Sequence, residues 1–182
     1  MAGGTPSPSS TNHVVSLLGR NAGLRYFELV YENGTFVPAE AGNFQFGITR
    51  DNPPATNVDT ANSTGGFGWR HFGSINMSVD PFQAASVIEA PALVPGDIIC
   101  GAINFTSLKV WFGRVIAGVP TWVRSGNPAA GIGETSVFTA GTYYIASCCG
   151  STDVNFRFDV RIRTGAAQFT GAIPVGFSAW AA

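Results

Sequence analysis

Apolar and polar residues alternate with a period of two along most of the chain, and this period is typical of β-strands rather than helices. The clearest case is residues 96–113. A Gly96-Asp97 turn starts an alternating run at 98–105, the segment 106–108 makes a short turn, and a second apolar run follows. A turn of this length joins antiparallel neighbours. The segment therefore predicts a β-hairpin.

The same pattern predicts strands in most of the chain. They cover residues 14–18, 25–31, 43–48, 67–72, 98–105, 108–116, 120–124, 142–148, 152–163 and 175–180. Asn33-Gly34 is a strong turn signal, and residues 51–66 form a long polar loop. No segment keeps a helical period for three turns. We therefore expect one all-β domain over residues 14–182, an antiparallel β-sandwich of two packed sheets.

Residues 1–13 differ from the rest because they are rich in Pro, Ser and Gly. Such a segment cannot bury enough apolar surface to offset the entropy lost when it becomes ordered. We expect a flexible, extended N-terminal arm that a neighbouring subunit holds in place.

Charged residues make up 12% of the 182-residue chain, about half the usual share of a soluble domain. This favours a subunit with much of its surface packed on neighbours; the alternative is a soluble domain that is simply rich in Gly and Ala. The net charge of −1, without a basic run, argues against nucleic-acid binding. No apolar run approaches 18 residues, so we expect no membrane insertion.

The residues that usually carry chemistry are few and scattered. Cys100 and the adjacent pair Cys148-Cys149 show no metal-ligand or disulfide spacing, so buried free thiols are expected. The two histidines are His13, in the arm, and His71, which follows the possible interface residues Trp69 and Arg70. No nucleophile with a base and no carboxylate pair can be nominated. We therefore expect no catalytic site, cofactor or metal, and no enzymatic activity.

Aromatic and arginine residues at predicted strand ends are the best candidates for binding. These residue types are enriched at interface hot spots, and aromatic rings also stack on sugars. The alternative is that Trp69, Trp111, Trp122 and Trp180 fill the core, which we expect for Trp111. The candidate binding loops contain Trp69, Arg70, His71, Trp122, Arg124 and Asn127.

Several motifs resemble the SPRY-like domains, sandwiches of concanavalin type, of bacteriophage virion proteins. The main one is Gly-Asp-x-Ile…Phe…Lys-Val-Trp-Phe-Gly at 96–113, followed by Ser-Gly-Asn-Pro-Ala at 125–129. Weaker matches follow the family's order at 24–29, 67–69, 141–144, 154–156 and 174–180. The resemblance implies a bent β-sandwich with binding loops at one end and no catalytic residues. The chain departs from the family at 115–120 and 156–173, so only fold and general role carry over.

These observations lead to one expected function and one alternative. We expect a non-enzymatic bacteriophage virion structural protein, such as a head decoration, fibre-base or tail component. It would be made in the host cytoplasm, bind other virion proteins through its arm and loops, and form a homo-oligomer in the particle. The alternative is a receptor- or carbohydrate-binding module of a tail fibre or spike that recognises a host surface glycan or receptor. A glycan depolymerase is more remote, because the acidic residues are too scattered to nominate a pair.

Overall fold

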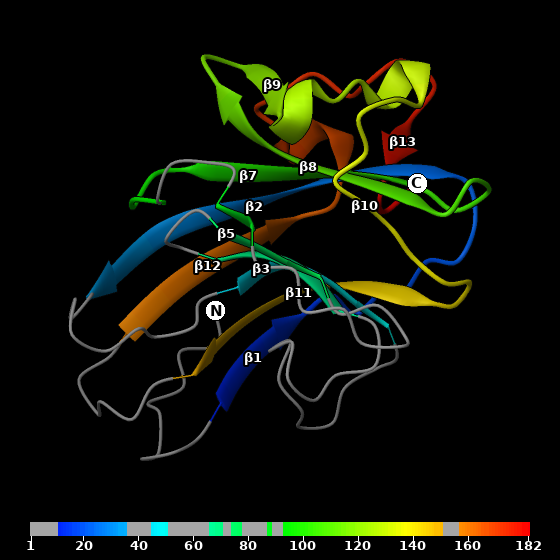
Figure 1. The fold of residues 1–182 in the computed structure, drawn as a ribbon. Helices are drawn as coiled ribbons and strands as arrows, with labels where there is room; N and C mark the ends of the chain where they lie inside the picture. Colours follow the sequence, from blue (N-terminus) through cyan, green and yellow to red (C-terminus); the bar gives the residue numbers. More distant parts are fainter. Residues whose placement is uncertain are drawn as a thin grey trace.

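The chain folds into two sheets of mainly antiparallel strands, packed face to face (Figure 1). The structure, a computed structural model, describes residues 11–35, 45–50, 66–70, 74–77, 87–88, 93–150 and 157–182. The six-stranded sheet has the order β1 (Thr11–Val15), β11 (Tyr143–Gly150), β3 (Gln45–Arg50), β4 (Gly66–Arg70), β5 (Ser74–Met77) and β6 (Val87–Ile88). The predicted all-β sandwich is confirmed.

The second sheet has seven strands. Its order is β10 (Ser136–Val137), β8 (Lys109–Ile116), β7 (Ile98–Asn104), β2 (Leu24–Thr35) and β12 (Arg157–Arg163). In addition, β9 (Val119–Trp122) pairs with β8, and β13 (Ser178–Ala179) pairs with β2 in parallel. The helical elements of the described residues are three 3-10 turns: η1 (Val123–Ser125), η2 (Pro128–Ala130) and η3 (Ala166–Gln168).

The predicted hairpin at 96–113 is present. β7 and β8 are antiparallel neighbours whose last pair is Asn104 with Lys109. Asn104 stabilises the turn, because its side-chain oxygen accepts hydrogen bonds from the backbone N–H groups of Thr106 and Ser107, each at 2.9 Å. Gly101 of β7 lies opposite Phe27 of β2, and a Cβ there would lie 2.3 Å from the Phe27 ring. Glycine is therefore required where that ring packs on the backbone.

Two hydrophobic clusters lie on opposite faces of the seven-stranded sheet. The larger cluster fills the space between the sheets and takes Phe27 and Ile103 from one sheet and Phe46 and Ile145 from the other. The smaller cluster contains Tyr26, Cys100, Ala102, Trp111 and Phe177. β9, the 3-10 turns and the segment before β13 lie over that second face (Figure 1). The strands β2, β7 and β8 are thus buried on both faces.

The C-terminal residues are held by arginines that precede β2 or lie at its start. Arg20 donates to the carbonyl oxygens of Trp180 and Ala182, at 2.7 and 2.8 Å. Arg25 also donates to the Ala182 oxygen, at 2.6 Å. The Trp180 indole N–H donates to the Leu18 carbonyl at 2.8 Å, and its ring is buried against Phe27. These contacts tie the last strand to the first long one.

Three expectations about element boundaries change. The turn predicted at Asn33-Gly34 is wrong, because both residues lie inside β2 and pair with β12. The pairing shifts by one residue between Asp159 and Val160 of β12, which leaves Glu32 of β2 without an opposite residue. Pairing with β12 therefore overrides the turn preference of Asn33-Gly34. The strand predicted at 175–180 is limited to Ser178–Ala179. The strand predicted at 120–124 ends at Trp122, where η1 begins.

The N-terminal arm boundary also moves. β1 begins at Thr11 and pairs His13 with Cys148, so the last three residues of the predicted arm belong to the six-stranded sheet. Residues 1–10, the polar loop at 51–65 and the start of the strand predicted at 152–163 lie outside the described residues. Short strands β5, β6 and β10 were not predicted.

Replacing Trp111 by Ala should lower the free energy of unfolding by about 3–5 kcal/mol, as expected for removing a fully buried aromatic side chain. Urea denaturation followed by circular dichroism measures this loss. The exposed Val94, changed to Ala, is the control and should alter stability by less than about 0.5 kcal/mol. A loss below about 1 kcal/mol for Trp111→Ala would contradict its place in the second cluster.

The β8–β9 hairpin provides a second test. Its two-residue turn holds Ala117 at φ 49° and Gly118 at φ 80°. A non-glycine residue is disfavoured by about 1–2 kcal/mol in this left-handed region, whereas Asn tolerates it. Ala117→Asn should therefore raise the free energy of unfolding by up to about 1 kcal/mol. Ala172→Asn, at an exposed position without positive φ, should give no such gain. Equal effects at the two positions would exclude backbone strain as the cause.

Candidate functional site

The six candidate binding residues do not come from one part of the fold. Trp122 ends β9, Arg124 lies in η1, and Asn127 precedes η2, so these three share one loop on the seven-stranded sheet. Trp69 and Arg70 lie in β4 of the six-stranded sheet, paired with Phe46 and Gln45. His71 lies outside the described residues.

Trp122 and Asn127 have structural roles in that loop. The half-buried ring of Trp122 packs edge-on against Tyr26, with centroids 6.4 Å apart. The Asn127 side-chain oxygen accepts a hydrogen bond from the Ala130 N–H at 3.1 Å, which caps η2. Its backbone also exchanges two hydrogen bonds with Ile132. Both side chains therefore hold the loop in shape.

Arg124 is exposed, and its backbone is strained. Arg124 and Ser125 have φ values of 57° and 52°, two successive non-glycine residues in the left-handed region. The Arg124 guanidinium donates to the Thr135 carbonyl oxygen at 3.2 Å, across the base of the loop. Hydrogen bonds such as this one hold the loop in place, and they compensate for the unfavourable backbone conformation at Arg124 and Ser125.

Side chains of β8 hold the same loop from below. Lys109 donates to the Gly131 carbonyl at 2.9 Å, and the Trp111 indole N–H donates to the Ile132 carbonyl at 2.9 Å. Thr135 bonds to β8 much as a residue of a neighbouring strand would. Its hydroxyl oxygen accepts a hydrogen bond from the Phe112 N–H, and its own N–H donates to the Val110 carbonyl oxygen. The loop is therefore a rigid extension of the sheet.

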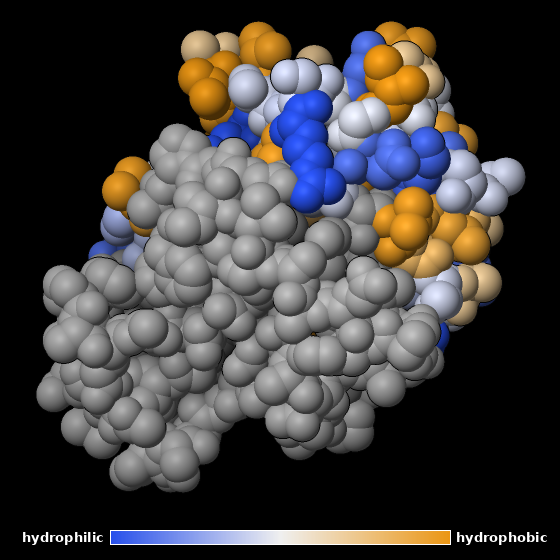
Figure 2. All heavy atoms as spheres, viewed as in Figure 1, coloured by the Kyte–Doolittle hydropathy of each residue, from blue (hydrophilic) through white to orange (hydrophobic). Residues whose placement is uncertain are grey.

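We call residues 115–135 and 164–177 the outer layer, because they cover the second hydrophobic cluster. Arg124 and Glu134 are the only charged residues in these two segments, all of which the structure describes. Four aliphatic side chains of the outer layer are nevertheless exposed: Ile116 (56%), Val119 (62%), Ile132 (60%) and Val175 (85%). Figure 2 shows hydrophobic residues at both upper corners of the molecule, over this layer, with polar residues between them.

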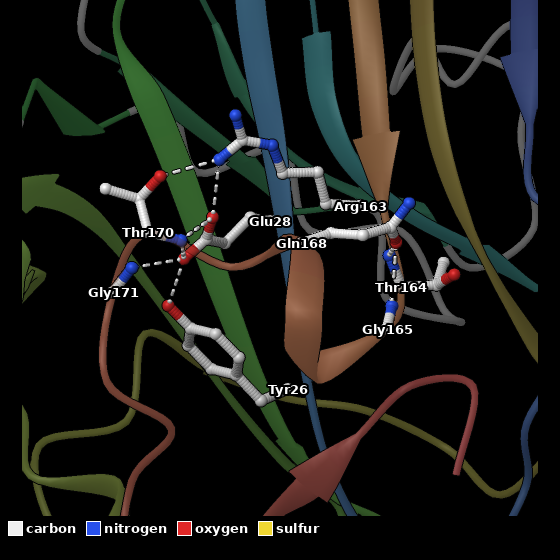
Figure 3. A network of polar contacts seen from close by, with 8 residues as sticks. All are labelled: Tyr26, Glu28, Arg163, Thr164, Gly165, Gln168, Thr170 and Gly171. Carbon is white, nitrogen blue, oxygen red and sulfur yellow. Dashed lines mark hydrogen bonds and ion pairs between the residues drawn. The ribbon is translucent and has the colours of Figure 1, made fainter.

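A buried carboxylate that sequence reasoning missed anchors the outer layer. Glu28 of β2 is completely buried and accepts hydrogen bonds from the N–H groups of Thr170, at 3.0 Å, and Gly171, at 2.7 Å (Figure 3). The Tyr26 hydroxyl donates to it at 3.1 Å and the Arg163 guanidinium at 3.2 Å. Arg163 also donates to the Thr170 hydroxyl at 2.7 Å. The available signal was one charged residue inside the apolar run 26–31.

The groups around Glu28 keep their protons. Burial raises the pKa of the Cys100 thiol, and the negative charge of Glu28 raises it further. Burial also raises the pKa of Tyr26, with Cys100 and Glu28 adding to the effect. A protonated, buried thiol is a poor nucleophile, and a neutral Tyr26 can donate to the carboxylate. The arrangement serves to hold a segment in place.

Within 11–35, 45–50, 66–70, 74–77, 87–88, 93–150 and 157–182, no three His, Cys, Asp or Glu side chains come together as a metal site would require. In the same part of the chain, no helix is long and apolar enough to cross a membrane.

Changing Glu28 to Gln should lower the free energy of unfolding by about 3 kcal/mol, because it leaves Arg163 without its buried partner and turns an amide toward two N–H donors. The loosened segment should also make Cys100 react faster with a thiol reagent in the native protein. Peptide mapping by mass spectrometry separates Cys100 from Cys148 and Cys149.

The matched control is Glu32→Gln, which removes the partner of the largely exposed Arg161. That exposed pair should contribute less than about 1 kcal/mol, and its loss should leave Cys100 unreactive. Equal effects of the two substitutions, or unchanged Cys100 labelling in Glu28→Gln, would contradict the anchoring role.

Comparisons with known proteins bear on the fold. No protein-family model and no curated protein matches this chain. Among solved structures, the chain is similar to the crystal structure of the SPRY domain of human HERC1, with a TM-score of 0.55 and 15% sequence identity. The match covers 85% of this chain and 82% of that one. At this identity the likeness shows the fold alone, so the chain has a SPRY-like β-sandwich fold.

Proposed function

We propose that this chain is a non-enzymatic structural protein that works by binding other proteins, and that it does so in a bacteriophage particle as a head decoration, fibre-base or tail component. The observation that carries the proposal is the outer layer, with two charged residues and four exposed aliphatic side chains. A surface that remains in water normally carries interspersed charge. Depletion of charge is instead typical of the centre of protein interfaces.

The rigidity of the outer layer supports the same function. The hydrogen bonds from Lys109 and Trp111 and the cap at Asn127 hold the loop in one conformation before any partner arrives. A surface that is already ordered loses little conformational entropy on binding, so more of its contact energy appears as affinity. The outer layer therefore has the composition and the order of a protein-binding face.

The bacteriophage setting rests on the resemblance of residues 96–113 and 125–129 to virion proteins and on the low charge of the whole chain. Residues 96–113 form most of the β7–β8 hairpin, and residues 125–129, at the end of η1 and the start of η2, lie within the outer layer. The glycan- or receptor-binding alternative has weaker support. Trp122, one of its two tryptophan candidates, packs on Tyr26.

Incorporation into particles tests the proposal. We expect the chain to be found by mass spectrometry in purified particles of the phage that encodes it. Val119→Lys with Val175→Lys should lower its amount at least tenfold, because both charges enter the apolar face. Circular dichroism checks that the variant is folded.

The matched control is Val94→Lys, the same change at a position that is 56% exposed and outside the outer layer. It should be incorporated normally. Absence of the wild-type chain from purified particles would refute the virion role, and normal incorporation of the double variant would exclude the outer layer as the binding face.

A further inference from the structure

We propose that the outer layer binds the outer layer of a second copy of this chain, in a contact with two-fold symmetry. This inference rests on the proposed protein-binding function and names the partner. A two-fold contact places one surface against itself: where residue i of one copy contacts residue j of the other, j of the first copy also contacts i of the second. The surface must therefore be free of repulsion toward an identical surface.

The charge distribution of the outer layer meets this requirement. Its two charged residues, Arg124 and Glu134, have opposite signs, and Glu134 already pairs with Lys109 at 3.2 Å. Two copies can thus meet without a cluster of like charges. An interface with a different protein commonly gains its specificity from complementary electrostatic potential on the two surfaces. The outer layer carries too little charge to provide such a potential. The low charge of the outer layer is therefore compatible with an identical face, which favours a second copy of the chain.

The tip of the β8–β9 hairpin supplies the apolar part of the contact. Ile116 and Val119 face each other across the hairpin, and both are more than half exposed. The hairpin is held in place from beneath: a Cβ on Gly171 would lie 2.9 Å from Val115 and 3.1 Å from Pro120. Gly171 is in turn bound to Glu28. The tip is therefore a fixed apolar projection.

The partner binds through side chains rather than by adding a strand. In a two-residue hairpin the flanking pair, Ile116 and Val119, is the hydrogen-bonded one. The next residue, Pro120, then directs its nitrogen away from β8, and proline has no N–H to donate. The edge of β9 that faces away from β8 therefore cannot readily pair with another strand. The side chains of Val119 and Thr121 are exposed.

Sedimentation of the purified full chain over a concentration series tests the proposal. We expect a species of twice the 19.0 kDa chain mass at high concentration. Val119→Lys with Val175→Lys should weaken self-association at least tenfold, since each copy would bring two positive charges into the contact, whereas Val94→Lys should leave it unchanged. Hydrogen exchange should slow with concentration at 116–122 and 170–176.

The outcomes separate this inference from the proposed function. A chain that stays monomeric at every concentration, or a dimer that survives the double variant with unchanged exchange in the outer layer, overturns the two-fold contact. If the chain is monomeric while the double variant is still lost from particles, the outer layer binds another virion protein. In that case the proposed function stands and the choice of partner is wrong.

Discussion

The burial of Glu28 determines where the C-terminal part of the chain can lie. A carboxylate inside a protein is stable only when its charge and its lone pairs are compensated. Here the compensation comes from Arg163 of β12 and Tyr26 of β2, in the same sheet, and from the backbone of Thr170 and Gly171, in the segment that crosses over the sheet. Removing the crossing segment would leave a charge under-compensated, so the sheet and the outer layer form one unit.

The second face of the seven-stranded sheet explains why such an anchor is needed. The outer layer has little regular strand pairing: β9 pairs with β8, Thr135 donates to Val110 of β8, and β13, which follows the layer, pairs with β2. Apolar contacts such as Phe169 on Tyr26 and Phe177 on Trp111 hold it down without setting a register. Hydrogen bonds are directional, so those to Glu28 fix the position of the segment on the sheet, which the ring contacts do not.

Strand positions could be predicted from the sequence where both faces of the strand are buried. In β7 and β8 the side chains alternate between the two clusters, so Val110 and Trp111 lie on opposite faces yet are equally buried. Pattern alone identified these strands, but it gave no sign that a second layer covers them. Asn33-Gly34 failed as a turn because the strand β12 that pairs with it is more than a hundred residues away in sequence.

The candidate site could be predicted only in part, for a related reason. Residue type drew attention to the loop that contains Trp122, Arg124 and Asn127, but their contacts with Tyr26, Thr135 and Ala130 depend on how the loop folds back. Glu28 could not be singled out, since a charged residue in a strand usually faces water. Its role depends on Arg163, and no local pattern relates residues so far apart.

The hydrogen bonds between Glu28 and the outer layer constrain which residues of that layer can change. The exposed residues Val119 and Val175 can change without disturbing Glu28, because their side chains point away from the buried network. Gly171 cannot, because it lies against Val115 and Pro120 while donating to the carboxylate. Variation should therefore be confined to the exposed positions of the outer layer, while the buried positions determine whether the layer keeps its structure.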